Sequence, residues 1–452
     1  MWAAPASAQR PLHTGFLDPG SFTHEAASFD KARSAGATRA RLALFWVSVA
    51  YKGEPAAPSL WNAPEYNWPF FDRQVRRAVD AGLEPIVGIQ VAPEWATATG
   101  TGHTERPNLA EFAAFVTAAA NRYDGSKTAP NGMELPRVRY WQVWNEPNRN
   151  YSLSPQFDGA GRIVAADWYR DMVRLMGAAV RGVHADNQVV AGGLAPLGRR
   201  AHAAPLAFMR ALLCVDADLK RTCPLQDAPL EFDVWAHHPY TPGAPTRKAA
   251  GRNDVVITGL PKMRKLLNAA IRLGHVRTRG PVELWATEFA WDTAPPDPQA
   301  LPTKIHARWT AEALYRMWKA GVTTVTWFLV QDEPMRTSRY QSGLYTVAGK
   351  RKLSFRAFRF PVVAFPTKKG IQVWGRTPFG QRGRVQVLVK AGKRWRALGR
   401  LQTSEHGIFR ATFRTSLRGP VQARFGREQS VPFSLKPVRD RYVEPFGSPL
   451  RP

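Results

Sequence analysis

Two glutamates in this sequence stand near the ends of apolar runs, where a carboxylate can act as an acid, a base or a nucleophile. Glu146 follows the aromatic and β-branched run of residues 139–144, which Pro147 then stops, and Glu288 lies near the end of the run 282–289. Two carboxyl groups that face each other across a cleft can cleave a glycosidic bond. One protonates the leaving oxygen, and the other attacks the anomeric carbon or activates water. This chemistry requires a fold that brings the two runs together.

The chain up to about residue 360 alternates between short apolar runs and longer runs with helical periodicity. Eight runs are typical of strands, at residues 12–16, 38–49, 84–91, 139–144, 188–192, 232–240, 282–289 and 323–330. Helices are expected between them at 23–35, 70–81, 108–123, 166–184, 205–214, 260–273 and 304–321. Apolar strands that alternate with helices indicate a parallel sheet buried on both faces. We therefore predict an α/β fold, a (β/α)₈ TIM barrel over residues 12–360, with both glutamates at its C-terminal rim.

After residue 360 the apolar period becomes two. Runs at 371–374, 384–389, 395–398, 408–413 and 421–425 alternate apolar with polar residues and are separated by glycine-containing turns. The pattern predicts a small C-terminal antiparallel β-sandwich domain over residues 367–436, joined to the barrel by residues 360–366. We expect residues 1–11 to be a residual signal or a flexible N-terminus, and residues 437–452 to be a tail.

The formal net charge of +28 is unevenly distributed. From Lys350 to the end there are 24 Lys and Arg residues against 4 Asp and Glu residues. A segment this basic can bind nucleic acid, anionic polysaccharide or an acidic cell surface, or it can be a solvated face with no partner. Trp374 and Trp395 alternate like core residues. We therefore favour a packing or carbohydrate-contacting role, with an anionic cell-surface polymer as candidate partner, over nucleic acid.

Several features favour a secreted or extracellular protein. Ala6-Ser7-Ala8 fits the small-x-small cleavage pattern of a secretory signal. Cys214 and Cys223, the two cysteines, can close a short loop as a disulfide, and two free buried thiols are the alternative. No apolar run approaches the ~18 residues of a membrane span.

Two short motifs resemble the catalytic motifs of the clan A glycoside hydrolases, most closely family 39 and more distantly the family 5 cellulases. They are Trp144-Asn145-Glu146-Pro147, on the expected fourth strand, and Thr287-Glu288-Phe289, on the seventh. The resemblance covers the barrel, roughly three quarters of the chain. It implies that Glu146 is the general acid/base and Glu288 the nucleophile of a retaining mechanism that cleaves β-glycosidic bonds of a poly- or oligosaccharide.

Further positions match the same pattern. Arg41 is similar to the strand-two arginine beside the nucleophile, where a guanidinium favours the charged carboxylate. The His238-Pro239-Tyr240 segment is similar to the strand-six motif whose tyrosine contacts the nucleophile, and Trp327 resembles the strand-eight tryptophan under the −1 sugar. Family 5 members commonly carry a histidine at the end of strand three. Here that position reads Val91-Ala92-Pro93-Glu94-Trp95, which favours family 39.

Each assignment has a structural alternative. A buried glutamate or Arg41 can belong to a core ion pair, and His238 can be a core histidine. Trp46, Trp95, Trp144 and Trp291 can stack on sugar rings or pack in the core. Glu94 is a third carboxylate at the rim. We expect no cofactor and no metal, because the sequence carries neither HExxH nor GxxxxGK[ST]. The alternative function is a catalytically silent carbohydrate-binding barrel that its basic C-terminal module anchors to an anionic polysaccharide.

Overall fold

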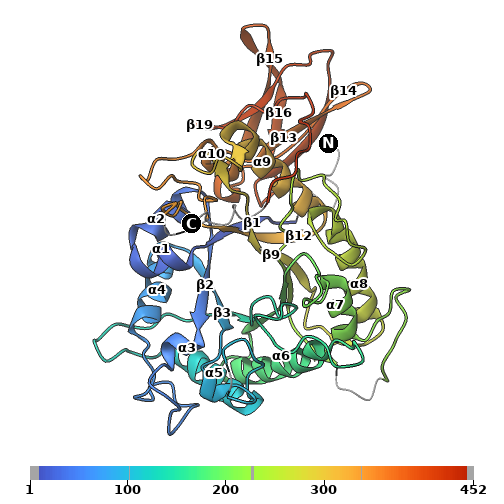
Figure 1. The fold of residues 1–452 in the computed structure, drawn as a ribbon. Coiled ribbons are helices and arrows are strands. Elements are labelled where there is room, and N and C mark those ends of the chain that lie inside the picture. The colour runs from blue at the N-terminus through green and yellow to red at the C-terminus, as the bar shows by residue number, and fades with distance from the viewer. Residues whose placement is uncertain (1–9, 101, 225–228, 337, 339, 445–452) are drawn as a thin grey trace.

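The computed structural model describes residues 10–444 apart from 101, 225–228, 337 and 339, and the larger part of it is a closed parallel barrel (Figure 1). The strands follow one another around the barrel in the order β1-β12-β9-β7-β5-β4-β3-β2. The ring closes where β1 pairs with β12, with His13 opposite Thr324. The predicted fold class is confirmed. The eight strands are β1 (His13–Leu17), β2 (Arg39–Phe45), β3 (Glu84–Gln90), β4 (Tyr140–Val143), β5 (Gln188–Leu194), β7 (Val234–His237), β9 (Glu283–Phe289) and β12 (Val322–Phe328).

Helices surround the strands and bury their outer faces (Figure 1). Each presents an apolar stripe inward, as α6 does with Met172, Val173, Met176 and Val180. All seven helices expected between the strands are present, the first of them as two pieces. The helices of the barrel are α1 (Pro19–His24), α2 (Ala27–Ser34), α3 (Trp46–Val49), α4 (Pro69–Asp80), α5 (Leu109–Arg122), α6 (Val164–Val183), α7 (Pro205–Leu213), α8 (Leu260–Arg272), α9 (Thr303–Lys319) and α10 (Leu353–Arg359).

Several boundaries differ from the prediction by a few residues, and two of these differences have a clear local cause. The first helix begins at Pro19 rather than Thr23 because the Asp18 carboxylate accepts a bond from the Ser21 amide at 2.9 Å and so caps it. The chain breaks again at Glu25, which has extended dihedrals. The second strand ends at Phe45 instead of continuing to residue 49, because Trp46 begins the short helix α3.

Two antiparallel sheets form the C-terminal domain. One has the order β13-β14-β17 and the other β16-β15-β18-β19. Residues 360–366, which we expected to be a connector, lie mostly in β13, which pairs with β14 along its length. The strands are β13 (Val362–Thr367), β14 (Gly370–Arg376), β15 (Arg384–Ala391), β16 (Arg394–Gln402), β17 (Ile408–Arg414), β18 (Val421–Phe425) and β19 (Glu428–Gln429).

The C-terminal domain packs directly on the outside of α9 and α10 (Figure 1). The Trp374 ring on β14 lies 5.3 Å from the rings of Tyr315 and Trp318 on α9. Trp374 is 1% exposed, as its alternation with polar residues predicted. The two domains therefore share one aromatic core.

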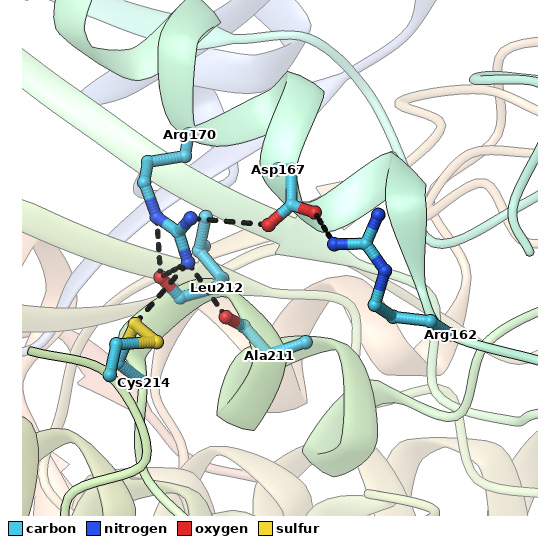
Figure 2. Close-up of a disulfide and its surroundings, with 7 residues drawn as sticks. Arg162, Asp167, Arg170, Ala211, Leu212 and Cys214 are labelled. Carbon is cyan, nitrogen blue, oxygen red and sulfur yellow. Dashed lines mark hydrogen bonds and ion pairs between the residues drawn. A yellow bond between two sulfur atoms is a disulfide. The ribbon is translucent and has the colours of Figure 1, made fainter.

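Cys214 and Cys223 form the expected disulfide, which closes the loop after α7. Figure 2 shows the surroundings of this bond: the Arg170 guanidinium donates to the carbonyls of Ala211 and Leu212 and to Cys214 Sγ. Two further strand pairs stabilise loops at the two ends of the barrel. β6 (Leu230–Glu231) pairs with β8 (Val276–Arg277) in the loops that precede β7 and β9, and β10 (Thr293–Ala294) pairs with β11 (Leu301–Pro302) in the loop that follows β9. Among the described helices, none combines the length and apolarity that crossing a bilayer requires.

Candidate active site

The two glutamates meet at the C-terminal rim of the barrel, although they come from different strands. Glu288 is the penultimate residue of β9. Glu146 follows β4 by three residues, in a turn where both Trp144 (φ 58°) and Glu146 (φ 46°) have left-handed dihedrals. The Glu146 amide donates to the Gly193 carbonyl at 3.1 Å, which ties this turn to the neighbouring strand β5. Left-handed dihedrals are costly for non-glycine residues, and such strain is typical of functional positions.

Glu288 accepts hydrogen bonds from two side chains that orient its carboxylate. Arg41 Nη1 lies 3.0 Å from its Oε2, and the Tyr240 hydroxyl donates to its Oε1 at 2.9 Å. Arg41 is itself fixed, because its Nε donates to Gln142 at 3.0 Å and its Nη2 to the Asn145 side chain at 2.8 Å. The guanidinium thus joins the asparagine of one motif to the glutamate of the other.

Glu146 lies in a different environment. Burial raises the pKa of its carboxyl, and the nearby Arg149 guanidinium, 3.8 Å away, partly opposes this shift. The Tyr151 hydroxyl donates to Glu146 Oε2 at 3.3 Å. Burial and the neighbouring carboxylate raise the pKa of Tyr151 to about 12, so its hydroxyl stays protonated. A carboxyl group whose pKa is raised by burial is suited to give a proton.

His238 lies between the two carboxylates. Its Nδ1 is 3.1 Å from Glu146 Oε1 and 3.7 Å from Glu288 Oε2. Because both oxygens contact the same nitrogen, the distance between Glu146 Oε1 and Glu288 Oε2 cannot exceed the sum of these two distances. Burial lowers the pKa of His238 to about 3, so the imidazole is neutral, and the oxygens around Nδ1 place its one proton there.

Two neighbouring cavities open at the carboxylates and share Tyr151, Glu288 and Phe328 as walls. The larger, of about 340 Å³, is also lined by Arg41 and Asn145. The smaller, of about 280 Å³, is lined by a mixed set of polar and apolar residues: Glu146, Arg149, Pro196, Leu197, Arg199, Tyr240, Tyr340 and Glu444. Together they form a cleft that passes over both glutamates.

The structure corrects the expectation that sugar rings contact the tryptophans Trp46, Trp95, Trp291 and Trp327. Trp46, Trp291 and Trp327 are 0% exposed, so they present no ring face to a ligand. Trp46 stacks on Phe115 in the core at 4.9 Å, and the Trp327 indole donates to the Ser342 carbonyl at 2.7 Å. Trp95 is half-buried against Trp46. Within the described residues, none of the four lines either cavity.

The aromatic wall of the cleft comes instead from Phe328 and Tyr151, because Trp144 borders the larger cavity but is itself only 1% exposed. Phe328 follows Trp327 directly, and strand alternation turns the two side chains to opposite sides. Tyr151 and Gln142 are the other residues that sequence reasoning missed. The position of Gln142 on β4, three residues before Asn145, could have indicated it. Glu94 is exposed at the start of a 3₁₀ turn and lines neither cavity of the described structure.

The cleft offers carboxylates, arginines and tyrosines, and the described part of the chain has no cluster of three or more metal-ligating side chains. No protein-family model and no curated protein sequence matches this chain. Solved structures do match. A family 39 glycoside hydrolase from Bacteroides cellulosilyticus superimposes with a TM-score of 0.55 at 18% identity, over 90% of this chain and 82% of that one.

Two further solved structures are similar. A monomeric β-xylosidase from Caulobacter crescentus gives a TM-score of 0.53 at 14% identity, with 91% of this chain and 95% of that chain covered. A glucosidase from Croceicoccus marinus gives 0.52 at 15% identity, with 88% and 82% covered. The resemblance to family 39 that the two motifs carry is therefore confirmed at the level of the fold.

Proposed function

We propose that this protein is a retaining glycoside hydrolase that cleaves β-glycosidic bonds in a poly- or oligosaccharide. The observation that carries the proposal is the pair of carboxylates at one rim in contrasting environments. Burial raises the pKa of Glu146, whereas Arg41 and Tyr240 hold the carboxylate of Glu288 in place. Groups with such different surroundings divide into a proton donor and an anionic nucleophile.

In the first step a carboxylate oxygen of Glu288 attacks the anomeric carbon and the bond to the leaving oxygen breaks. Glu146 gives its proton to that oxygen, which departs as an alcohol. In the second step Glu146, now a carboxylate, takes a proton from water, and the resulting hydroxide oxygen displaces Glu288 from the sugar. The enzyme returns to its starting protonation, and two displacements retain the configuration of the anomeric carbon.

The neighbouring residues have positioning roles in this mechanism. Arg41 and Tyr240 orient both oxygens of Glu288 for attack, and Asn145, held by Arg41, faces the larger cavity, where it can contact a sugar hydroxyl. The contact of one His238 nitrogen with both carboxylates supports the retaining course. Retaining enzymes separate their carboxyl groups by about 5–5.5 Å, and inverting enzymes separate them further to admit a water.

The test uses 4-nitrophenyl β-glycosides. Glu288→Gln and Glu146→Gln should each remove nearly all turnover. With Glu288→Gly, added azide should restore turnover and give a glycosyl azide of inverted configuration. With Glu146→Ala the azide product should keep the configuration of the substrate, because azide then attacks the glycosyl-enzyme. Full activity in either Gln variant, or the opposite pair of configurations, would refute the assignment.

The alternative is a silent carbohydrate-binding barrel anchored by the basic C-terminal domain. Residues 362–429 contain 15 Lys and Arg residues and 2 Glu residues, and the arginines of the edge strand β16 (Arg394, Arg396 and Arg400) are exposed. Such a face fits an anionic polymer. We propose this anchoring as a second role of the domain. Retention of the protein on alginate beads that weakens with rising salt would support it, and salt-independent behaviour would contradict it.

We also propose that the protein works outside the cytoplasm. The Cys214–Cys223 disulfide is the observation behind this proposal, because such bonds persist in oxidising compartments. The small-x-small pattern at residues 6–8 agrees with it, although these residues lie outside the described part of the structure.

A further inference from the structure

The segment of residues 440–444 returns from the C-terminal domain to the rim of the barrel. Asp440 Oδ1 accepts a hydrogen bond from the Ala244 amide at 2.8 Å, and its Oδ2 lies 3.0 Å from the Arg247 guanidinium. The Arg441 guanidinium donates to the Ala300 carbonyl, in the loop after β10. Val443 is 4% exposed. These contacts hold the segment against the loops that follow β7 and β9. His238 comes directly after β7, and Glu288 lies on β9.

The loop beneath this segment is shaped to receive it. Gly243 has φ +130°, and a Cβ at this position would lie 2.8 Å from Asp440 Oδ1 and 2.9 Å from the Arg441 carbonyl oxygen. It would also lie 2.3 Å from Arg247 Nε. Any residue larger than glycine would therefore collide with the segment and with the arginine that holds it. Both the loop around Gly243 and residues 440–441 are therefore shaped to fit each other.

The two cavities divide the cleft by function under the proposed mechanism. Glu146 must reach the leaving oxygen, so the cavity that Glu146 lines is the leaving-group side. Arg41 and Asn145 line the other cavity, which holds the sugar that Glu288 attacks. Glu444, the last described residue of the seated segment, lines the leaving-group side.

The chemistry of this wall points to a hydroxyl-bearing ligand. The Tyr442 hydroxyl donates to the Glu444 carboxylate and orients it. Arg149 and Arg199 line the same cavity and supply hydrogen-bond donors there. A carboxylate accepts hydrogen bonds from neighbouring hydroxyl groups, and guanidinium groups donate to the ring and hydroxyl oxygens of the same sugar.

We propose that Glu444 is a specificity-determining residue that binds the hydroxyls of a sugar in the leaving-group position, and that Asp440 positions it. This inference rests on the proposed glycosidase function. It means that the substrate is cut between two sugars, and that residues 440–444, which follow the C-terminal domain in sequence, complete the site. Asp440 does not contact the sugar; it acts only by holding the segment against the loop around Gly243.

The experiment compares two leaving groups on one glycone. A panel of 4-nitrophenyl β-glycosides identifies the glycone, and the β-1,4-linked disaccharide of that glycone is the second substrate. In Glu444→Gln the ratio of kcat/KM for the disaccharide to kcat/KM for the aryl glycoside should fall about tenfold, the effect of weakening a hydrogen bond to a charged group. The aryl group has no hydroxyls for Glu444 to bind.

Two further variants separate binding from structure. Asp440→Asn should lower the same ratio mainly through a higher KM for the disaccharide. Glu405→Gln is the matched control, since this glutamate of the C-terminal domain is 70% exposed, and it should leave the ratio as in the unmodified protein. An unchanged ratio in Glu444→Gln, or equal losses on both substrates, would overturn the inference and leave the proposed function standing. Absence of any turnover by the unmodified protein would overturn both.

Discussion

His306 on α9 is a buried, uncharged base whose protonation should oppose folding. It is 0% exposed, its Nε2 donates to the Trp291 carbonyl at 2.9 Å, and its ring lies 5.6 Å from that of Trp327. Burial, followed by the positive charge of Lys352, lowers the pKa of His306 from 6.5 to about 3. We predict that replacing this histidine changes how stability depends on pH.

The sign and the size follow from proton linkage. As pH falls below 6.5 the unfolded chain binds a proton at His306, whereas the folded chain leaves it neutral until about pH 3. The folded state therefore loses stability over this window, by about 1.4 kcal/mol per pH unit. At pH 5 the loss is about 2 kcal/mol for this one residue.

The assay is urea unfolding of the unmodified protein and of His306→Phe at pH 8, 6 and 5. At pH 8 the variant should be less stable by about 1–3 kcal/mol, because the Trp291 carbonyl loses its donor. At pH 5 this deficit should shrink by about 2 kcal/mol, because the variant has no proton to take up at this site. The comparison is made at each pH because burial raises the pKa values of Asp18 and Asp332 to about 6, and their titration opposes that of His306.

The control is His24→Gln on α1, an exposed histidine whose replacement should change the free energy of unfolding by less than about 0.5 kcal/mol. A His306→Phe deficit of the same size at pH 8 and pH 5 would refute the reasoning. So would a deficit that grows as the pH falls.

Three further predictions concern the site and the loop beyond it. Tyr240→Phe should lower kcat/KM on aryl glycosides about 10- to 100-fold, because the nucleophile loses a hydrogen bond to a charged group; a change below twofold would contradict this role. Arg149→Gln should move the basic limb of the pH profile of kcat/KM upward, since the guanidinium holds the pKa of Glu146 down, and a downward shift would contradict it. Replacing Cys214 and Cys223 by serine should lower the free energy of unfolding by about 2–3 kcal/mol with kcat unchanged, so an altered kcat would show that the loop reaches the site.

The fold and the carboxylate pair could be predicted because their signals are local. Each strand is a short apolar run, and the residues at its end must lie at one rim once the barrel closes. Glu146 and Glu288 were recognisable as strand-end carboxylates in matching motifs. Arg41, His238 and Tyr240 came from the same reasoning, and the structure brings all five within hydrogen-bonding or ion-pair contact.

The remainder of the cleft could not be predicted, because it depends on which side of a strand or loop a residue faces. Trp327 and Phe328 are adjacent apolar residues, and nothing in their types says which one faces the cleft. Tyr151 lies in a loop without a periodic pattern, so its contact with Glu146 depends on the path of that loop. Glu444 belongs to a stretch that we expected to be tail, and its position depends on a contact with the loop around Gly243.

The packing of Trp374 against Tyr315 and Trp318 bears on how this architecture can be inherited. A domain that is exchanged freely between proteins during evolution needs a polar surface of its own and a flexible linker. Here the Trp374 indole of the sandwich packs on the barrel helix α9, and β13 follows α10 after only two residues. The chain then returns to the C-terminal rim of the barrel, where Asp440 contacts the loop after β7. Recombination at this junction would expose apolar surface to solvent on both domains. We therefore expect the two parts to be inherited together as one unit, and the barrel to lose stability when its sandwich is exchanged for another.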